Sequence, residues 1–201
     1  MSLFLRQLRP AAVALLLLTC IVGVAYPLVV TGIAQVVWPF QANGSIIRGT
    51  DGAPLGSALI GQPIADPGSF WGRVSATPEF PYNAAASSGS NYGPLSPDLA
   101  ALIEERVAAL RAADPENTDP IPVDLITTTA SGLDPHISPA AARYQAERVA
   151  RERGLSVAQV TGLIAEHTEG RTLGVLGEPR VSVLQLNLAL DALAPLAAGR
   201  P

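Results

Sequence analysis

An uninterrupted apolar run near the N-terminus constrains this chain more than any other feature. Residues 11–38 contain no charged side chain, and about 20 apolar residues in a helix are enough to cross the hydrocarbon core of a bilayer. A single membrane span must be helical, because only a helix pairs all the backbone groups of one segment within the lipid. The run therefore predicts one transmembrane helix, with a kink at Pro27, where a backbone N–H is missing.

The charges on the two sides of this run are unequal. Arg6 and Arg9 precede it without any acidic residue, whereas eleven arginines and all seventeen acidic residues follow it, which gives the later part a net charge of −6. Basic residues on a short flank mark the cytoplasmic side of a span. We therefore expect residues 1–10 in the cytoplasm, residues 11–38 in the membrane, and residues 39–201 as an extracytoplasmic soluble domain.

Two other interpretations of the apolar run remain open. Gly-Val-Ala at residues 23–25 has the small-x-small pattern of a signal peptidase site, although the apolar sequence continues well beyond it. Leu-Leu-Thr-Cys at residues 17–20 resembles a lipoprotein cleavage site, but threonine is a poor residue before the cysteine. The anchor is the favoured interpretation.

Composition excludes several classes of function for the soluble part. Its acidic balance argues against nucleic-acid binding, which depends on clustered positive charge. The only cysteine, Cys20, lies within the apolar run, so the soluble part has no thiol for a disulfide, a metal or redox chemistry. His136 and His167 stand alone in the sequence, and without cysteine a zinc site would require distant carboxylates; hydrogen-bonding roles are the better expectation for both.

Strand signals in the soluble part are short. Residues 55–64 predict one or two strands interrupted by Gly56, Gly61 and Pro63. Residues 123–130, with three consecutive threonines, predict another. Residues 181–188 alternate as a strand does, but they also fit a helix, and Pro179 before them with the alanine-rich stretch after them favours the helix.

Helix signals dominate after Ser96, which is a plausible N-cap followed by Pro97. One apolar stripe follows it, formed by Leu99, Leu102, Ile103, Val107 and Leu110. A second helix is expected between the cap Ser138 and Gly154, and a third after Ser156, which forms a capping-box pattern with Gln159. The fold class predicted is a single N-terminal transmembrane helix plus a mixed α/β (α+β) soluble domain with a small sheet and about four helices.

Catalytic motifs are missing from the sequence. A chain without lysine has no phosphate-binding loop of the G-x-x-x-x-G-K-[ST] type, and no G-x-S-x-G nucleophile elbow is present. Four other motifs are distinctive: F-W-G-R at residues 70–73 with S-A-T at 75–77, S-S-G-S-N at 87–91, S-G-L-D-P-H-I-S-P at 131–139, and H-T-E-G-R at 167–171 ending in G-E-P-R at 177–180. Each alone is consistent with turn and cap chemistry.

These four motifs, in this order behind one apolar span, resemble the C subunit of the bacterial Kdp potassium-transporting ATPase (the KdpC family). The L-N-L-A-L-D string at residues 186–191 fits as well, and the resemblance covers nearly the whole chain. It implies a non-catalytic accessory subunit of an ATP-driven, high-affinity potassium uptake pump in the bacterial inner membrane. The catalytic subunit of such a pump carries a D-K-T-G-T motif, which a chain without lysine does not have.

The resemblance also implies partners and ligands. The family's complex combines a channel-like potassium subunit, a P-type ATPase subunit and a small membrane peptide, which together handle K⁺ and ATP. The family's C subunit is described as a catalytic chaperone that raises ATP affinity, which suggests ATP contact. The topology expected here opposes direct contact, because nucleotide is cytoplasmic; no cofactor is therefore expected to bind this chain directly, and any effect on ATP is expected to be indirect.

The candidate site residues are positions for partner contact, with no catalytic residue and no metal ligand among them. Small or kinked positions in the span are expected to face another helix, and two loops are expected to dock on a partner. The residues are Gly23, Pro27 and Gly32 in the span, and Ser87, Ser88, Gly89, Ser90, Asn91, Asp134, Pro135 and His136 in the loops.

Two alternatives from other functional classes are kept. One is a membrane-anchored serine hydrolase that uses Ser87 or Ser88 with His136 or His167 and Asp134. It requires the nucleophile and the base within hydrogen-bond reach. The other is an exported binding protein released by cleavage after Ala25.

Overall fold

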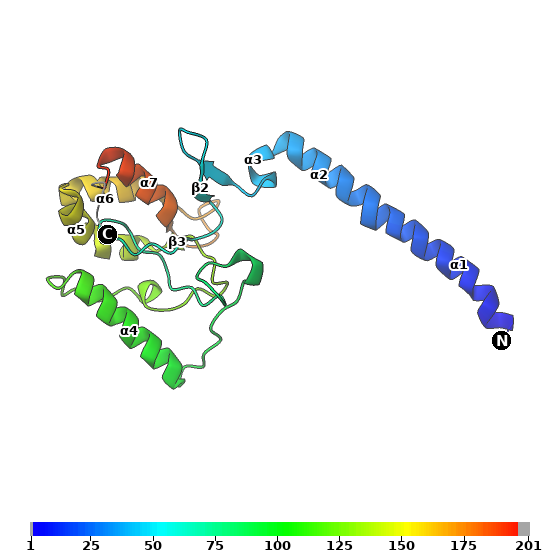
Figure 1. Ribbon diagram of the computed structural model, residues 1–201, viewed down its shortest axis with the longest axis horizontal. Coiled ribbons are helices and arrows are strands. Elements are labelled where there is room, and N and C mark those ends of the chain that lie inside the picture. Colours follow the sequence, from blue (N-terminus) through cyan, green and yellow to red (C-terminus); the bar gives the residue numbers. More distant parts are fainter. Residues whose placement is uncertain (1, 197–201) are drawn as a thin grey trace. The chain divides into compact units, whose positions relative to one another are not determined.

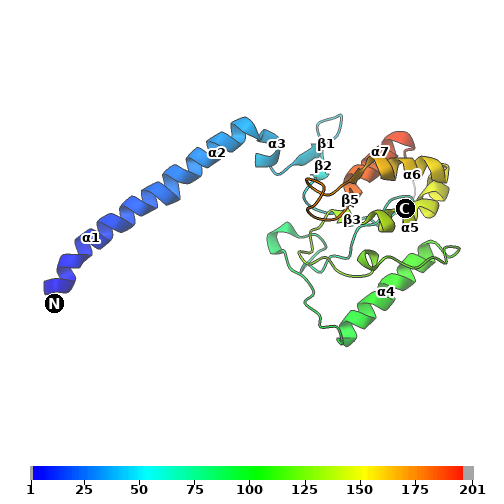
Figure 2. The same ribbon diagram turned by 180° about the vertical axis from the view of Figure 1, so that it is seen from behind.

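The computed structural model describes residues 2–196 and divides into two compact units, residues up to 46 and residues from 47 onward, each described by itself (Figures 1 and 2). The first unit is mainly one long helical segment. It consists of α1 (Ser2–Leu18), a π-helical stretch η1 (Thr19–Ala25), α2 (Tyr26–Val37) and the short α3 (Pro39–Ala42). Between Arg6 and Val37 the helix has 32 residues and is long and apolar enough to cross a membrane, since each residue adds about 1.5 Å.

The irregularity expected at Pro27 lies in the turns before it. Instead of α-helical geometry, residues Thr19–Ala25 have the wider π-helical hydrogen-bonding pattern, and Pro27 follows at the start of α2. Proline has no N–H for the preceding turn, and a π-helical stretch is one way in which a helix accommodates that loss.

The second unit combines helices with two small sheets. Its elements are β1 (Ile46–Arg48, at the boundary), β2 (Pro54–Ser57), η2 (Ala84–Ala86), α4 (Pro97–Ala113), η3 (Val123–Leu125), β3 (His136–Ile137), α5 (Pro139–Arg153), α6 (Val157–Glu166), β4 (Thr168–Glu169), β5 (Arg180–Ser182) and α7 (Val183–Leu193). β1 pairs with β2, and β5 lies between β3 and β4 in an antiparallel sheet. This part of the chain thus confirms a helix-and-small-sheet domain with four α-helices among its described residues.

Local cap chemistry explains where three of these helices begin or end. Ser96 occupies the N-cap position of α4, but its side chain makes no capping hydrogen bond, and Pro97 in the first turn is the local feature that favours this helix start. Ser138 Oγ accepts the N–H of Ala141 at the start of α5, and Gly154 ends that helix with φ 67°. Ser156 and Gln159 form the reciprocal capping box of α6. These predictions are confirmed.

The strand predicted over residues 123–130 is wrong. The chain there forms the short 3-10 helix η3, and Thr128 makes only an isolated bridge with Val74. The hydroxyl of Thr127 donates to the carbonyl of Val123, and Arg106 donates to the carbonyl of Leu125. Threonine side chains that bond the local backbone compete with strand pairing, and Leu125 is fully buried instead of alternating in a sheet.

Two other strand predictions are partly correct. Within residues 55–64 only the beginning forms a strand, β2, and the stretch after Ser57 has no regular structure. The ambiguous residues 181–188 use both of their patterns, because β5 ends at Ser182 and α7 begins at Val183 without an intervening loop.

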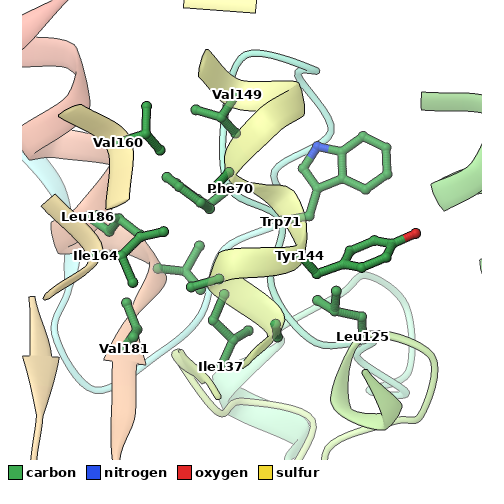
Figure 3. Close-up of a cluster of buried hydrophobic side chains, with 14 of the residues drawn as sticks. Phe70, Trp71, Leu125, Ile137, Tyr144, Val149, Val160, Ile164, Val181 and Leu186 are labelled. Atoms are coloured by element: carbon green, nitrogen blue, oxygen red, sulfur yellow. The ribbon is translucent and has the colours of Figure 1, made fainter. Parts of the chain in front are cut away.

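The core lies around α5, α6 and α7 (Figure 3). Figure 3 shows Phe70 pointing toward Val160 and Leu186, while Trp71 points to the other side, where Tyr144 lies. Phe70 is completely buried and Trp71 is nearly so. Two adjacent aromatic residues of an irregular segment therefore fill both sides of the core next to α5.

Trp71 is held by polar groups of α5. Its backbone N–H donates to Oε1 of Gln145 at 2.8 Å, and Nε2 of Gln145 donates to its carbonyl at 3.1 Å. The guanidinium of Arg148 lies 4.6 Å from the centre of its ring, within cation–π range. Burial lowers the pKa of Arg148 to about 10, so this arginine is charged at neutral pH.

Helix α4 stands apart from the group formed by α5, α6 and α7 (Figures 1 and 2). Of its predicted apolar stripe only Leu110 is buried, and the other four residues are half-buried. Arg106 attaches the helix to the rest of the domain, because it donates to the carbonyls of Leu125 and Gly72 and lies 5.3 Å from the Trp71 ring.

Candidate functional site

Three of the four distinctive motifs meet in one place, which we call the Arg73 cluster and define as residues 72–77, 87–91 and 128–136. The hydroxyl of Ser75 donates to the carbonyl of Gly132 at 2.8 Å. The backbone N–H of Thr129 donates to the carbonyl of Val74 at 3.0 Å. Stretches that are separated by more than 50 residues in the sequence are therefore joined by direct hydrogen bonds.

Asp134 is the centre of charge in this cluster. Its carboxylate accepts Arg73 Nη1 at 3.2 Å on one oxygen, and the backbone N–H and Nδ1 of His136 at 3.0 and 3.3 Å on the other. Burial alone would raise the pKa of Asp134, but the hydrogen bonds from His136 and Arg73 outweigh it and lower the pKa below its ordinary value. The turn Asp134–His136 is thus a fixed, ionised corner.

The loop 87–91 rests on the other two stretches through its serines. Ser87 donates to the carbonyl of Ser131 at 2.9 Å, and Ser88 donates to the carbonyl of Ala76 at 3.3 Å. The hydroxyls of Ser90 and Thr128 are 2.9 Å apart. The loop 87–91 is therefore hydrogen-bonded to residues 128–131, the stretch that leads into the second predicted docking loop, Asp134–His136.

Two glycines let the backbones of this cluster approach. A Cβ on Gly89 would lie 2.6 Å from the carbonyl oxygen of Ala130. Gly132 has φ +72°, and a Cβ there would lie 2.5 Å from Thr77 Cγ2 and 2.7 Å from the carbonyl oxygen of Ser88. Neither position has room for a side chain, and a left-handed backbone favours glycine at the second.

Tyr82 is a residue of the site that the sequence reasoning missed. Its hydroxyl donates to the carbonyl of Arg73 at 2.6 Å, and its ring fills the space that a Cβ on Gly61 or Gly72 would need. Burial raises the pKa of this phenol, with the charge of Arg106 partly opposing it. The sequence signal for this contact is the pair Gly61 and Gly72, but two glycines alone do not show that a tyrosine packs against them.

Two open clefts border the Arg73 cluster. One, of about 370 Å³, lies between α4 and residues 62–65, 72–75 and 81–82, with Arg106 and Glu105 on its α4 wall. The other, of about 480 Å³, lies next to β3 and is bordered by Asp134, His136 and Arg180. Arg73 borders both, and its Nε is buried without a hydrogen-bond partner among the described residues.

The arrangement does not support a serine hydrolase. Ser87 and Ser88 donate to backbone carbonyls, His136 pairs with Asp134, and His167 Nδ1 lies 2.9 Å from the carbonyl oxygen of Leu163. Over residues 2–196, no hydrogen bond joins either serine to either histidine. A nucleophile requires a base that accepts its proton, and these hydroxyls are used as structural donors.

In the part of the chain that the structure describes, no group of three His, Cys, Asp or Glu side chains lies close enough together to hold a metal ion. The candidate helix positions lie on an open surface. A Cβ on Gly32 would meet nothing within 4 Å, and one on Gly23 would meet only Thr19 Cγ2 at 3.6 Å. Pro27 lies between them at the start of α2.

The chain is similar to known proteins over nearly its whole length. A family model described as the K⁺-transporting ATPase, c chain (KdpC), matches residues 8–192. The KdpC subunit of the potassium-transporting ATPase from Polaromonas naphthalenivorans is 62% identical over 189 residues, covering 94% of this chain and 96% of the relative. The corresponding subunits from Herpetosiphon aurantiacus and Methylococcus capsulatus are each 61% identical, covering 94% of this chain and 97% and 99% of themselves.

Proposed function

Because the chain belongs to the KdpC family of K⁺-transporting ATPase subunits, we propose that it is a membrane-anchored subunit that stabilises the pump from outside the cytoplasm. It is an accessory subunit of the potassium pump and not the catalytic one. The observation that carries the function is the family match, which extends over both the apolar helix and the soluble domain.

The proposed anchor is the helix Arg6–Val37. Its charge asymmetry supports residues 1–10 in the cytoplasm, residues 11–38 in the membrane and residues 39–201 outside, because Arg6 and Arg9 lie on one flank and every acidic residue lies on the other. In bacteria this membrane is the inner membrane. A cleaved signal or a lipoprotein is less well supported, because the apolar sequence continues past both candidate cleavage sites.

The proposed partners are the channel-like potassium subunit, the P-type ATPase subunit and the small membrane peptide of the complex. In the membrane, Gly23, Pro27 and Gly32 would meet a partner helix, since small residues allow backbones to approach. Outside it, the loops Ser87–Asn91 and Asp134–His136 would dock on a partner. The internal hydrogen bonds of the Arg73 cluster support this role by holding both loops in one conformation.

K⁺ and ATP would then be handled by the partner subunits. A domain outside the cytoplasm does not touch cytoplasmic nucleotide, so an effect on ATP affinity would reach the catalytic subunit through the assembly as a coupling free energy. The acidic domain would enrich K⁺ only locally, because salt screens exposed charges over about 8 Å.

Co-purification from membranes of cells grown at limiting potassium tests the accessory role. We expect the chain to be recovered with a P-type ATPase subunit, and recovery of the chain alone would falsify the role. Protease treatment of intact spheroplasts tests the topology separately: digestion of the soluble domain is expected, and its protection would place the domain in the cytoplasm and restore direct nucleotide contact.

A further inference from the structure

The connection between β4 and β5, residues 170–179, exposes apolar side chains that the fold does not use. We call it the β4–β5 loop. Leu173 is 86% exposed, Val175 73% and Leu176 59%. Single exposed aliphatic residues need no explanation, but a group of them marks a surface for another molecule.

This loop is held in one shape. Nη2 of Arg171 donates to both carboxylate oxygens of Glu178 at 2.8 and 2.7 Å. The backbones of Thr172 and Leu176 exchange two hydrogen bonds, and Gly174 donates to the carbonyl of Arg171. Leu173, Val175 and Leu176, which we call the aliphatic group, therefore lie on a closed turn that hydrogen bonds hold in one conformation.

Leu173 has a backbone conformation that is unfavourable for leucine. Its φ is 55°, in the left-handed region that costs an L-residue free energy and that glycine adopts without a penalty. The side chain is also exposed, so leucine at this position adds neither a favourable backbone nor buried area. Backbone strain that the fold does not repay is a reason to look for a function outside the fold.

The charges around the loop indicate what kind of surface covers it. Arg171 pairs with Glu178, and Arg180 pairs with Glu169 at 2.7 Å, so the rim has paired charges of both signs. An anionic lipid surface attracts clusters of unpaired basic residues, and interfacial segments carry Trp or Tyr; residues 170–179 have neither. An apolar centre inside a polar rim is the composition of a protein–protein contact.

We infer that the β4–β5 loop inserts Leu173, Val175 and Leu176 into an apolar groove on the outer surface of another subunit of the same pump. This docking element is separate from the loops 87–91 and 134–136. The inference depends on the proposed accessory role, which supplies a partner subunit on that side of the membrane.

The first experiment compares two exposed leucines. Leu173→Ser in the full-length chain is expected to reduce recovery of the P-type ATPase partner by about tenfold or more, as for a truncated hot-spot residue. Leu95→Ser is the matched control, because Leu95 is 96% exposed in a different segment, and it is expected to leave recovery unchanged. Equal recovery with Leu173→Ser and wild type would overturn the inference, whereas a wild-type chain recovered alone would overturn the accessory role itself.

A second variant separates docking from folding. Leu173→Gly removes the side chain and the unfavourable φ together, so the thermal midpoint of the solubilised chain is expected to stay the same or rise while partner recovery falls. A fall in both the midpoint and the recovery would assign Leu173 to the fold and contradict the docking role.

A probe distinguishes the possible occupants. Cys20 is the only cysteine, so the double variant Cys20→Ser, Thr172→Cys accepts a single environment-sensitive dye beside the aliphatic group. We expect a blue shift when the variant assembles with the pump subunits, and none in phosphatidylethanolamine–phosphatidylglycerol vesicles alone. A shift in the vesicles would indicate lipid, and a concentration-dependent shift without partner subunits would indicate a second copy; either result would overturn the inference.

Discussion

The side chain of Asn187 completes both backbone hydrogen bonds of Phe70. Its Oδ1 accepts the N–H of Phe70 at 2.8 Å, and its Nδ2 donates to the carbonyl of Phe70 at 3.0 Å. Gln145 does the same for Trp71 from a different helix. Two amide side chains thus replace the strand partners that this buried, irregular segment lacks.

Replacing Asn187 by alanine leaves a buried N–H and a buried C=O without partners. Each unsatisfied group costs about 1–3 kcal/mol, so we expect Asn187→Ala to lower the free energy of unfolding by about 2–6 kcal/mol. Denaturant unfolding of the solubilised chain measures it. Gln185→Ala is the control, because Gln185 is exposed on the same helix; an equal loss in both variants would contradict the explanation.

Gly132→Ala is expected to destabilise the Arg73 cluster. Its Cβ would collide with Thr77 and with the carbonyl of Ser88, and φ +72° disfavours alanine. Gly162 is the opposite case, a helical glycine with open space around it, so Gly162→Ala should stabilise the chain by about 0.5–1 kcal/mol. Thermal midpoints that move in the same direction for both variants would contradict this account.

Asp134 is expected to make stability depend on acid pH. Because its pKa is lower in the folded than in the unfolded chain, its contribution is fully present above the ordinary pKa of an aspartate, about 3.9, and is lost as the pH falls through the lower folded value. Asp134→Asn should therefore be less stable than wild type at pH 7, and the difference should shrink toward pH 3. A difference that does not change with pH would show that the charge of Asp134 is not what matters.

Gly32→Leu is expected to weaken assembly within the membrane without preventing insertion. The added side chain fills open space on the helix surface, so only a partner helix would oppose it. Val30→Leu is the control, because two residues along a helix lie on nearly opposite faces. Membrane fractionation and partner recovery measure insertion and assembly; unchanged recovery for Gly32→Leu would exclude this face as a contact.

The parts of the fold that were predictable from the sequence are those determined by near neighbours. The apolar helix, the cap at Ser138 and the capping box of Ser156 with Gln159 depend on chemistry within a few residues. Both caps are where the sequence placed them, and the apolar helix covers the predicted run up to Val37 but begins before residue 11. The strand over residues 123–130 failed because Leu125 and its neighbours find tertiary partners such as Arg106.

The candidate site was predictable as motifs but not as a place. The hydrogen bonds of Ser87 and Ser88 span 44 and 12 residues, and the Arg73–Asp134 pair spans 61. No local pattern states which of these segments will meet. The aliphatic group at Leu173 was also missed, because its strained φ and its exposure appear only in three dimensions.

No loop separates β5, which ends at Ser182, from α7, which begins at Val183. β5 begins at Arg180, directly after the β4–β5 loop, and α7 begins three residues later. α7 carries Asn187, whose side-chain amide is hydrogen-bonded to the backbone of Phe70. A displacement of that loop would therefore be transmitted through the three residues of β5 directly to α7, one of the helices that surround the core.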